Sequence, residues 1–370
     1  MTVIENAVAG KRYVSASTRR VPVFNPATGE QSAELPLSTM AELNEAVASA
    51  KKAQVAWGEL TPMKRARVMF RFKALLDQHA DDLAREISRE HGKVHDDALG
   101  EVARGIDCVD YACGIPQLLK GEFSRNVGPS IDTYSDRQPL GVVAGITPFN
   151  FPAMVPMWMY PAAIACGNAF ILKPSERDPS ASMLAWNLFM EAGLPEGILN
   201  IVHGDKEMVD GILDHPDIKA VSFVGSTPIA EYVYQRGTRA GKRVQALGGA
   251  KNHMVILPDA DLDQAADALM GAGYGSAGER CMAISVAVPV GRETADALIA
   301  KLKPRVESLK IGPATDKDAE MGPVVTKMHR DKILGYIDSG VEQGASLVVD
   351  GRGFKLQGYE GGYYVGGTLF

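Results

Sequence analysis

Cysteine is scarce in this chain of 370 residues: there are four, at positions 108, 113, 166 and 281, and no two of them form a CxxC pair. Such spacing does not fit a disulfide framework, and no Cys/His cluster has the spacing of a zinc site. No apolar run reaches the ~18 residues that a membrane span needs, and Met1–Gly10 lacks the apolar core of a signal peptide. We therefore expect a cytoplasmic protein without a metal.

A surplus of positive charge is also missing. Lys and Arg number 39 against 45 Asp and Glu, the formal net charge is -6, and no basic block stands out. These features argue against a nucleic-acid partner. The hydrophobic content of 46% is ordinary for a globular protein, and 370 residues exceed one ordinary core, so we expect two or three domains.

The chain does contain a regular alternation of helical and strand-like segments. Thr39-x-x-Glu42 is a capping box that predicts a helix start, and further helices are predicted from Pro62 towards Ile87 and over 97–119. An extended polar stretch predicts a hairpin arm at 126–140. Short strand candidates follow, separated by helical patterns, at 142–146, 169–172, 198–202, 220–224, 243–247 and 253–256. This alternation predicts an α/β fold with a doubly wound parallel sheet, which binds ligands beyond the carboxyl ends of its strands.

Two loops that follow these strands carry polar groups suited to chemistry. Asn150 lies between two prolines in Pro148-Phe149-Asn150-Phe151-Pro152, and a fixed amide donor suits an oxyanion hole. Alternatively, this amide satisfies backbone groups of its own loop. Lys173 and Glu176 follow the next strand, where both can face a ribose, and the carboxylate would repel a 2′-phosphate, which favours NAD over NADP. Alternatively, the pair belongs to a solvated helix start.

Three later segments extend the pattern. Gly225-Ser226 stands at a strand-to-helix turn, where backbone N–H groups can approach a pyrophosphate. Ala246-Leu247-Gly248-Gly249 is a turn of mostly small residues that could lie close to a nicotinamide. Cys281 follows Arg280, whose guanidinium favours the nucleophilic thiolate, although a single cysteine is more often a small buried residue.

In this order, the segments resemble the aldehyde dehydrogenase superfamily over essentially the whole chain. Its amide-donor, ribose, pyrophosphate and nucleophile segments resemble Pro148–Pro152, Lys173–Glu176, Phe223–Ser226 and Gly278–Cys281. The resemblance implies that Cys281 and Asn150 are catalytic. It also implies an NAD site that contains Phe149, Lys173, Glu176, Gly225, Ser226 and Leu247. The implied layout is an NAD-binding domain at 1–125 and 141–250, an oligomerisation arm at 126–140 and a partial α/β catalytic domain at 251–370.

One departure from the family is informative. Hydrolytic members have a glutamate where this chain has Ala246, which cannot activate water, so the acyl thioester should persist until a thiol such as coenzyme A arrives. This departure resembles the CoA-acylating branch, which oxidises methylmalonate or malonate semialdehyde, loses carbon dioxide, and forms propionyl-CoA or acetyl-CoA. Such substrates carry a β-carboxylate, and the resemblance implies that Arg104 and Arg280 bind it.

The chain ends at Phe370, whereas family members continue into a Glu-x-Phe-Gly-Pro segment and a last oligomerisation strand. We therefore expect a truncated chain. The resemblance implies a homo-oligomer, dimer or tetramer, for the full-length family, and the truncation puts this state in question here. Two alternatives stay open: a hydrolytic NAD-dependent aldehyde dehydrogenase that uses another base, and a non-catalytic fragment.

Overall fold

The computed structural model describes residues 2–370, and the chain forms two compact units. The first unit comprises 1–21, 34–83 and 101–248, and the second comprises 22–33, 84–100 and 249–370. We expected segments 22–33 and 84–100 in the NAD-binding part, but they pack in the second unit. Long-range bonds hold them there: Tyr363 N–H donates to Pro26 O at 2.9 Å, and Ser276 N–H donates to Asp97 at 2.8 Å.

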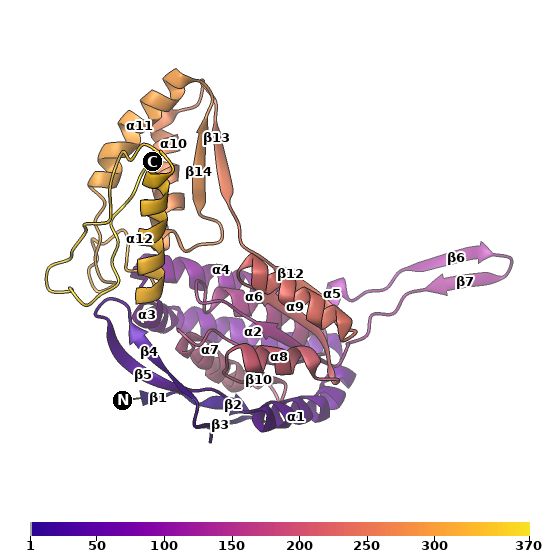
Figure 1. Cartoon of the computed structure of the whole chain (residues 1–370). Coiled ribbons are helices and arrows are strands. Elements are labelled where there is room, and N and C mark those ends of the chain that lie inside the picture. The colour runs from indigo at the N-terminus through magenta and orange to yellow at the C-terminus, as the bar shows by residue number, and fades with distance from the viewer. Residues whose placement is uncertain (1) are drawn as a thin grey trace. The chain divides into compact units, whose positions relative to one another are not determined.

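A seven-stranded sheet forms the centre of the first unit. Five of its strands are parallel: β12 (Arg243–Leu247), β11 (Ile218–Val224), β8 (Val142–Ile146), β9 (Ala169–Lys173) and β10 (Leu199–Ile201), in that order. Two antiparallel strands, β2 (Asn6–Val8) and β3 (Lys11–Tyr13), continue it beyond β10. Every residue of β8 and β9 is buried, as expected for parallel strands covered on both faces. The predicted α/β fold with a doubly wound sheet is confirmed (Figure 1).

The order of the parallel strands reverses between β8 and β11. From β8 the chain proceeds to β9 and β10 on one side, and then returns to β11 and β12 on the other. Ile146 at the end of β8 lies in register with both Lys173 and Phe223. In open α/β sheets, ligands bind beyond the carboxyl ends of the strands at such a reversal.

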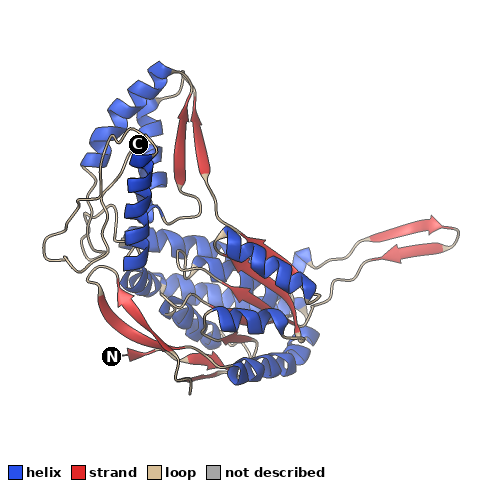
Figure 2. Cartoon of the chain, viewed as in Figure 1, coloured by secondary structure: helices blue, strands red, loops and turns tan. Residues whose placement is uncertain are grey.

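Two layers of helices cover this sheet. In one layer α2 packs on α6 and α7, and in the other α1 packs on α8, which contacts α9 (Figure 2). Their bounds are α1 (Met40–Glu59), α2 (Pro62–Gln78), α6 (Met154–Ala165), α7 (Ser180–Glu191), α8 (Lys206–Asp214) and α9 (Thr227–Arg239). The predicted capping box of α1 is confirmed, since Thr39 Oγ1 accepts from Glu42 N–H and Glu42 Oε2 accepts from Thr39 N–H, at 3.2 and 2.6 Å.

Two of the predicted helices are interrupted. The helix expected from Pro62 towards Ile87 breaks at His79, between α2 and α3 (Ala80–His91). The helix expected over 97–119 begins earlier and breaks at Gly114, between α4 (His95–Cys113) and α5 (Ile115–Leu118). Among residues 2–370, no helix combines the length and the apolar character that crossing a bilayer requires.

The hairpin predicted at 126–140 begins slightly earlier in the chain. It consists of β6 (Phe123–Gly128) and β7 (Ile131–Tyr134), which extend away from the sheet of the first unit (Figure 1). Phe123, Val127, Ile131 and Tyr134 are all exposed on it. A separate three-stranded sheet has the order β1 (Thr2–Val3), β5 (Glu30–Pro36), β4 (Arg20–Asn25).

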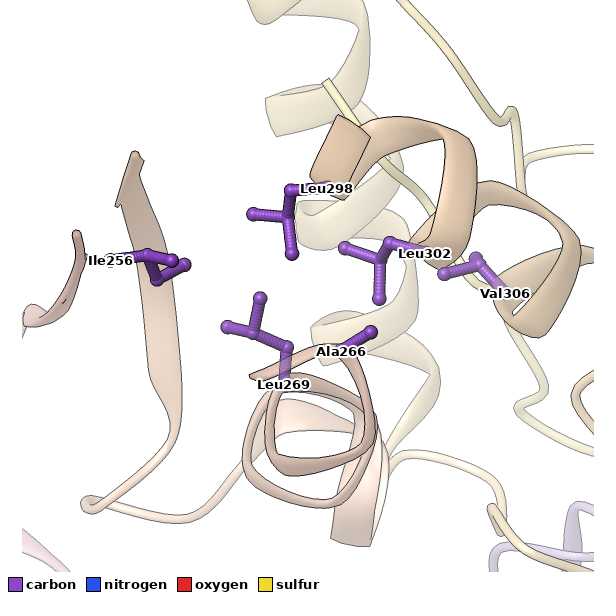
Figure 3. Packing of buried hydrophobic residues seen from close by; sticks show 6 residues of the cluster. All are labelled: Ile256, Ala266, Leu269, Leu298, Leu302 and Val306. Carbon is purple, nitrogen blue, oxygen red and sulfur yellow. The ribbon is translucent and has the colours of Figure 1, made fainter. Parts of the chain in front are cut away.

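The second unit has its own parallel pair of strands, β13 (Asn252–Ile256) and β14 (Ile284–Pro289). The strand predicted at 253–256 forms β13, within the segment 251–370 that we assigned to a separate catalytic domain, and it pairs with β14. The remaining elements are α10 (Leu262–Leu269), a π-helical turn η1 (Met270–Tyr274), a short helical segment η2 (Gly275–Gly278), α11 (Arg292–Glu307) and α12 (Lys327–Glu342). A core of Ile256, Ala266, Leu269, Leu298, Leu302 and Val306 joins β13, α10 and α11 (Figure 3). This core explains why β13 belongs to the second unit.

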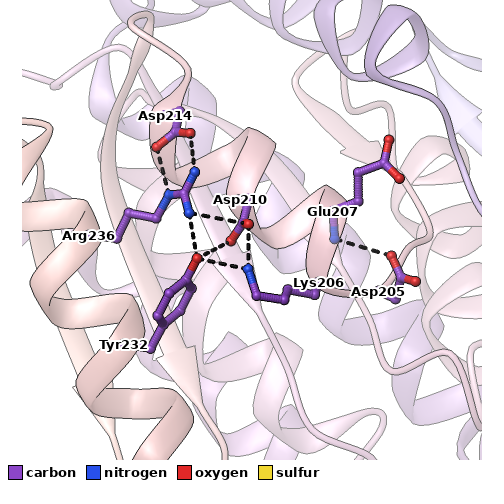
Figure 4. Close-up of polar contacts among 7 residues, drawn as sticks. All are labelled: Asp205, Lys206, Glu207, Asp210, Asp214, Tyr232 and Arg236. Carbon is purple, nitrogen blue, oxygen red and sulfur yellow. Dashed lines mark hydrogen bonds and ion pairs between the residues drawn. The ribbon is translucent and has the colours of Figure 1, made fainter.

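A polar network fixes α9, the helix that follows Gly225-Ser226, to α8. Arg236 donates to both carboxylate oxygens of Asp214, at 2.9 and 2.5 Å (Figure 4). Tyr232 donates to Asp210 at 2.7 Å and accepts from Lys206 at 3.0 Å. Bidentate pairing gives these contacts a defined geometry, so the network sets the position of α9.

The buried His203, which follows β10, should make the stability of the first unit decrease in acid. Burial lowers the pKa of His203 to about 4. The contact between its ring Nε2 and Glu5 O, at 3.0 Å, opposes this shift but is the weaker effect. The unfolded chain binds a proton at this histidine below about pH 6.5, whereas the folded chain does not until about pH 4. The free energy of unfolding should therefore be unaffected by His203 above pH 6.5 and should decrease by about 3 kcal/mol as the pH falls to 4. In His203→Gln this part of the loss should disappear. Chemical denaturation between pH 7 and 4 measures it.

The matched control is His79→Gln, which removes a partly exposed imidazole, 2.9 Å from Asp82, from the same unit. An unchanged pH slope in His203→Gln would show that His203 does not titrate on unfolding.

Candidate active site

The carboxyl ends of four adjacent parallel strands bring five of the predicted site residues to one edge of the first unit. Asn150 follows β8, Lys173 ends β9, Gly225 follows β11, and Ala246 and Leu247 end β12. The registers align these ends, since Ile146 pairs with Lys173 and Phe223, and Val224 pairs with Leu247. The structure therefore places these sequence-distant residues beside the reversal of strand order, where a ligand is expected.

The buried Lys173 and the half-buried Glu176 form an ion pair at the end of β9. Lys173 Nζ donates to Pro174 O at 2.8 Å, to Gly204 O at 2.7 Å and to Glu176 Oε2 at 3.2 Å. These three bonds use all the donors of an ammonium group. Burial alone would raise the pKa of Glu176, but the Lys173 charge and the hydrogen bonds lower it below the ordinary value. Lys173 therefore holds an ionised Glu176, whose side chain is 35% exposed and available to a hydroxyl donor.

The segment that contains Asn150 is held from α4. Glu101 is fully buried, and its Oε1 accepts from the N–H groups of Ala153 and Met154 at 2.9 and 3.1 Å. One turn along α4, the Arg104 guanidinium lies 5.7 Å from the ring centroid of Phe151. The structure thus places Arg104 beside the same loop as the half-buried Asn150.

Phe149, from the same loop, has its ring next to a cation. The Arg177 guanidinium lies 5.3 Å from the centroid of this ring. Arg177 belongs to the segment that follows β9 and is adjacent to Glu176 in sequence. The loops after β8 and β9 are therefore in contact through this pair.

Gly225 and Ser226 form a tight turn into α9. Gly225 N–H donates to Leu247 O at 3.1 Å, and a Cβ at Gly225 would lie 2.5 Å from the Phe223 ring. Only glycine fits here, because the turn passes so close to an aromatic side chain. Ser226 is the exposed N-cap residue of α9, and Leu247 is 44% exposed at the end of β12. The small size of Gly225 therefore lets the turn pass the Phe223 ring, and the first N–H groups of α9 follow directly after it.

Cys281 lies in the second unit, between η2 and β14, as a half-buried free thiol. Asn252 of β13 fixes its backbone: Asn252 Nδ2 donates to Cys281 O at 2.9 Å and to Ala283 O at 3.0 Å. Just upstream, Ser276, Ala277 and Gly278 have positive φ angles of 51°, 52° and 74°. The segment before Cys281 therefore contains a turn that L-residues rarely adopt, and the segment after it is held by the Asn252 amide of β13 and continues into β14.

The two residues before Cys281 point to internal partners. Arg280 makes an ion pair with Asp97, and its Nη1 donates to Gly271 O at 3.1 Å. Glu279 is almost buried: its Oε1 accepts from Val325 N–H at 3.4 Å, and its Oε2 lies 3.6 Å from Nε2 of the buried His91. Burial lowers the pKa of His91 well below its ordinary value, so this imidazole is neutral at pH 7. These contacts give Glu279 a structural function.

Three supporting residues were not identified from the sequence: Glu101, Asp97 and Asn252. A carboxylate within the apolar stretch of α4 was a signal for Glu101, since buried acids are normally bonded. Asp97 and Asn252 left no local signal, because their partners lie 29 to 183 residues away in the chain.

The sequence and the fold both have close counterparts among known proteins. Residues 13–370 match the sequence profile of the aldehyde dehydrogenase family. The malonate-semialdehyde dehydrogenase of Pseudomonas aeruginosa is 62% identical over 370 residues, which are 100% of this chain and 74% of that protein. Malonate-semialdehyde dehydrogenase 3 of Geobacillus kaustophilus is 52% identical over 367 residues, which are 99% of this chain and 75% of that protein.

Two solved structures of related proteins have the same fold as this chain. A Sinorhizobium meliloti protein described as a methylmalonate-semialdehyde dehydrogenase, in complex with NAD, superposes with a TM-score of 0.99 at 61% identity. The methylmalonate-semialdehyde dehydrogenase of Oceanimonas doudoroffii superposes with a TM-score of 0.98 at 56% identity. In both comparisons the match covers 100% of this chain and 75% of the other. The resemblance inferred from the sequence is confirmed, and the chain belongs to the aldehyde dehydrogenase family.

Proposed function

We propose that this chain oxidises malonate or methylmalonate semialdehyde with NAD and transfers the resulting acyl group to coenzyme A, with loss of carbon dioxide. One observation carries the choice of acceptor: Ala246, at the carboxyl end of β12, stands where the resemblance places the water-activating glutamate of hydrolytic relatives. The names of the relatives, at 62% and 61% identity, support the substrate class.

The residues at the sheet edge fit NAD. Glu176 is ionised and exposed enough to accept from ribose hydroxyls, and a carboxylate there disfavours a 2′-phosphate. Gly225 and Ser226 precede α9, whose N-terminal N–H groups can bind a pyrophosphate, and a Cβ at Gly225 would lie 2.5 Å from the Phe223 ring. NAD, when bound, accepts the hydride from the substrate.

Cys281 and Asn150 carry the covalent step. The Cys281 thiolate bonds to the aldehyde carbon, and the Asn150 amide donates to the oxygen as negative charge develops there. When the carbonyl re-forms, the hydrogen leaves with its electron pair and Cys281 retains the acyl group as a thioester. Asn252 holds the carbonyl groups of Cys281 and Ala283, so the backbone at and after the nucleophile stays in place.

Arg104 and Arg280 provide the charges that select the substrate. A guanidinium binds a carboxylate through two parallel N–H donors, so either side chain can orient the β-carboxylate. In the thioester, the carboxylate leaves as carbon dioxide because the carbonyl accepts its electron pair as an enolate, which is then protonated. Coenzyme A attacks the remaining acetyl or propionyl thioester, and the Cys281 thiolate is released.

The exposed apolar side chains of β6 and β7 support association of chains through this arm, and the four free cysteines support a reducing compartment such as the cytoplasm.

Omission of coenzyme A tests the proposed function. With malonate semialdehyde and NAD but no CoA, we expect one NADH for each Cys281 and then an almost complete stop, because Ala246 supplies no base for hydrolysis. Addition of CoA should restore steady turnover, with acetyl-CoA as product. Stopped-flow absorbance at 340 nm and mass spectrometry of the product measure this. Steady NADH production at the same rate without CoA would contradict the proposal and favour hydrolysis.

A further inference from the structure

Asp97, in the first turn of α4, joins two parts of the nucleophile segment within the second unit. Its Oδ2 accepts from Ser276 N–H at 2.8 Å, and its Oδ1 makes the ion pair with Arg280. The side chains of Asp97 and Arg280 are each 20% exposed. A single carboxylate therefore connects the start of the left-handed turn to the residue that precedes Cys281.

The turn needs an external contact of this kind. Ser276 and Ala277, with φ of 51° and 52°, are L-residues in a sparsely populated backbone region, and Gly278 continues it at 74°. Such conformations persist only where surrounding contacts determine them, and they concentrate at functional sites. Ser276 is 2% exposed, so the Asp97 bond to its N–H is shielded from water.

The Arg280 guanidinium is also held in one orientation. It lies against Gly275, where a Cβ would be 2.8 Å from Cζ, Nη1 and Nη2. Asp97 and Gly271 O each accept from one terminal nitrogen of Arg280, so these two contacts leave three of the five guanidinium N–H groups for other acceptors. Arg280 and Asp97 line a pocket of about 440 Å³, together with Met270, Tyr274, Arg305 and Glu320. Free donors at a pocket wall are suited to an incoming carboxylate.

We propose that Asp97 is the positioning residue of the nucleophile segment: it holds the turn at 276–278 and keeps Arg280 directed towards a carboxylate on the substrate. The second part rests on the proposed function, since it assumes a carboxylated aldehyde. The negative charge of Asp97 alone would weaken the attraction of Arg280 for a carboxylate. A positioning function and a purely electrostatic one therefore predict opposite effects when Asp97 is removed.

Alkylation of Cys281 tests the proposal without NAD or turnover. Iodoacetate and iodoacetamide react at the same sulfur, but only iodoacetate carries a carboxylate, so the ratio of their rate constants reports guidance by Arg280. On the 370-residue chain, peptide mass spectrometry assigns the reaction to Cys281. In Asp97→Ala we expect the iodoacetate-to-iodoacetamide ratio to fall about tenfold, as when a hydrogen bond to a charged group is lost. Arg280→Ala should show a similar fall.

Two variants separate geometry from charge. Asp97→Asn retains oxygen and shape without the charge, so the ratio should stay at or above the wild-type value. Asp96→Ala is the matched control, because it removes an equal, exposed charge from the same helical turn. If Asp97→Ala does not fold, Asp97→Ser provides the same test, because it also removes the carboxylate and retains a small polar side chain in the first turn of α4. A ratio that rises in Asp97→Ala, or stays unchanged there while it falls in Arg280→Ala, would overturn the proposal.

Hydrogen exchange distinguishes this proposal from the proposed function. The peptide that contains Ser276 should exchange faster in Asp97→Ala and at the wild-type rate in Asp97→Asn and Asp96→Ala. Unchanged exchange in Asp97→Ala overturns the proposal, whatever the substrate. If exchange is faster in Asp97→Ala but the iodoacetate-to-iodoacetamide ratio falls in neither Asp97→Ala nor Arg280→Ala, the result supports the part of the proposal in which Asp97 stabilises the turn at 276–278. That combination would instead remove Arg280 from carboxylate binding in the proposed function.

Discussion

Cys281→Ser should lose the single-turnover burst of NADH, with a decrease in rate of about 10³-fold or more. A serine hydroxyl is far less ionised than a thiol at neutral pH. The oxygen ester that it would form is also a poorer acyl donor to coenzyme A than the thioester of Cys281. Stopped-flow absorbance at 340 nm with enzyme in excess of malonate semialdehyde measures the burst. Iodoacetamide labelling, followed by peptide mapping, confirms that the sulfur is absent.

Cys166→Ser is the matched control, because this cysteine caps α6 in the first unit and burial raises the pKa of its thiol, so it should react slowly. It should retain the burst. The same experiment decides whether the chain is catalytic at all. A burst from the 370-residue chain that disappears only in Cys281→Ser rules out a non-catalytic fragment, whereas a burst that persists in Cys281→Ser would assign the nucleophile to another residue.

Ala246→Glu should convert the chain towards hydrolysis. A carboxylate at the end of β12 would supply the missing base, and general-base catalysis contributes about 10²–10⁴-fold, so turnover without CoA should rise by about 10²-fold. The product should change from acetyl-CoA to free acid. Steady-state NADH formation without CoA and product analysis by mass spectrometry measure both changes.

Ala246→Gln is the matched control, since it has nearly the same size but no basic oxygen. If both variants hydrolyse equally fast, water access and not base catalysis limits the release of the acyl group. If neither hydrolyses, position 246 does not determine the acceptor.

Local signals predicted the elements of the first unit well. The strands β8 and β9 are short apolar runs, and the capping box of α1 lies within four residues, so both could be recognised without the fold. The positions of Asn150, Lys173 and Gly225 at one sheet edge followed from the parallel order of the strands. This prediction needed only the general rule for doubly wound sheets.

Packing between distant segments could not be predicted in the same way. The resemblance placed the strand at 253–256 in the second domain, but its own residues do not show that it pairs with β14 and packs on α10 and α11. Asp97 looks like an ordinary acidic residue at a helix start, because its contacts with Ser276 and Arg280 span 179 and 183 residues. Its importance appears only in the folded chain.

The bond between Gly225 N–H and Leu247 O has an evolutionary consequence. It ties the end of β12 to the turn before α9, so the backbone at Ala246 and the backbone proposed to receive the cofactor are held together. A substitution at position 246 changes one side chain on a frame that is already fixed. Under the proposed function, one codon change at position 246 would therefore exchange the final acceptor, water or a thiol, without a change in this backbone.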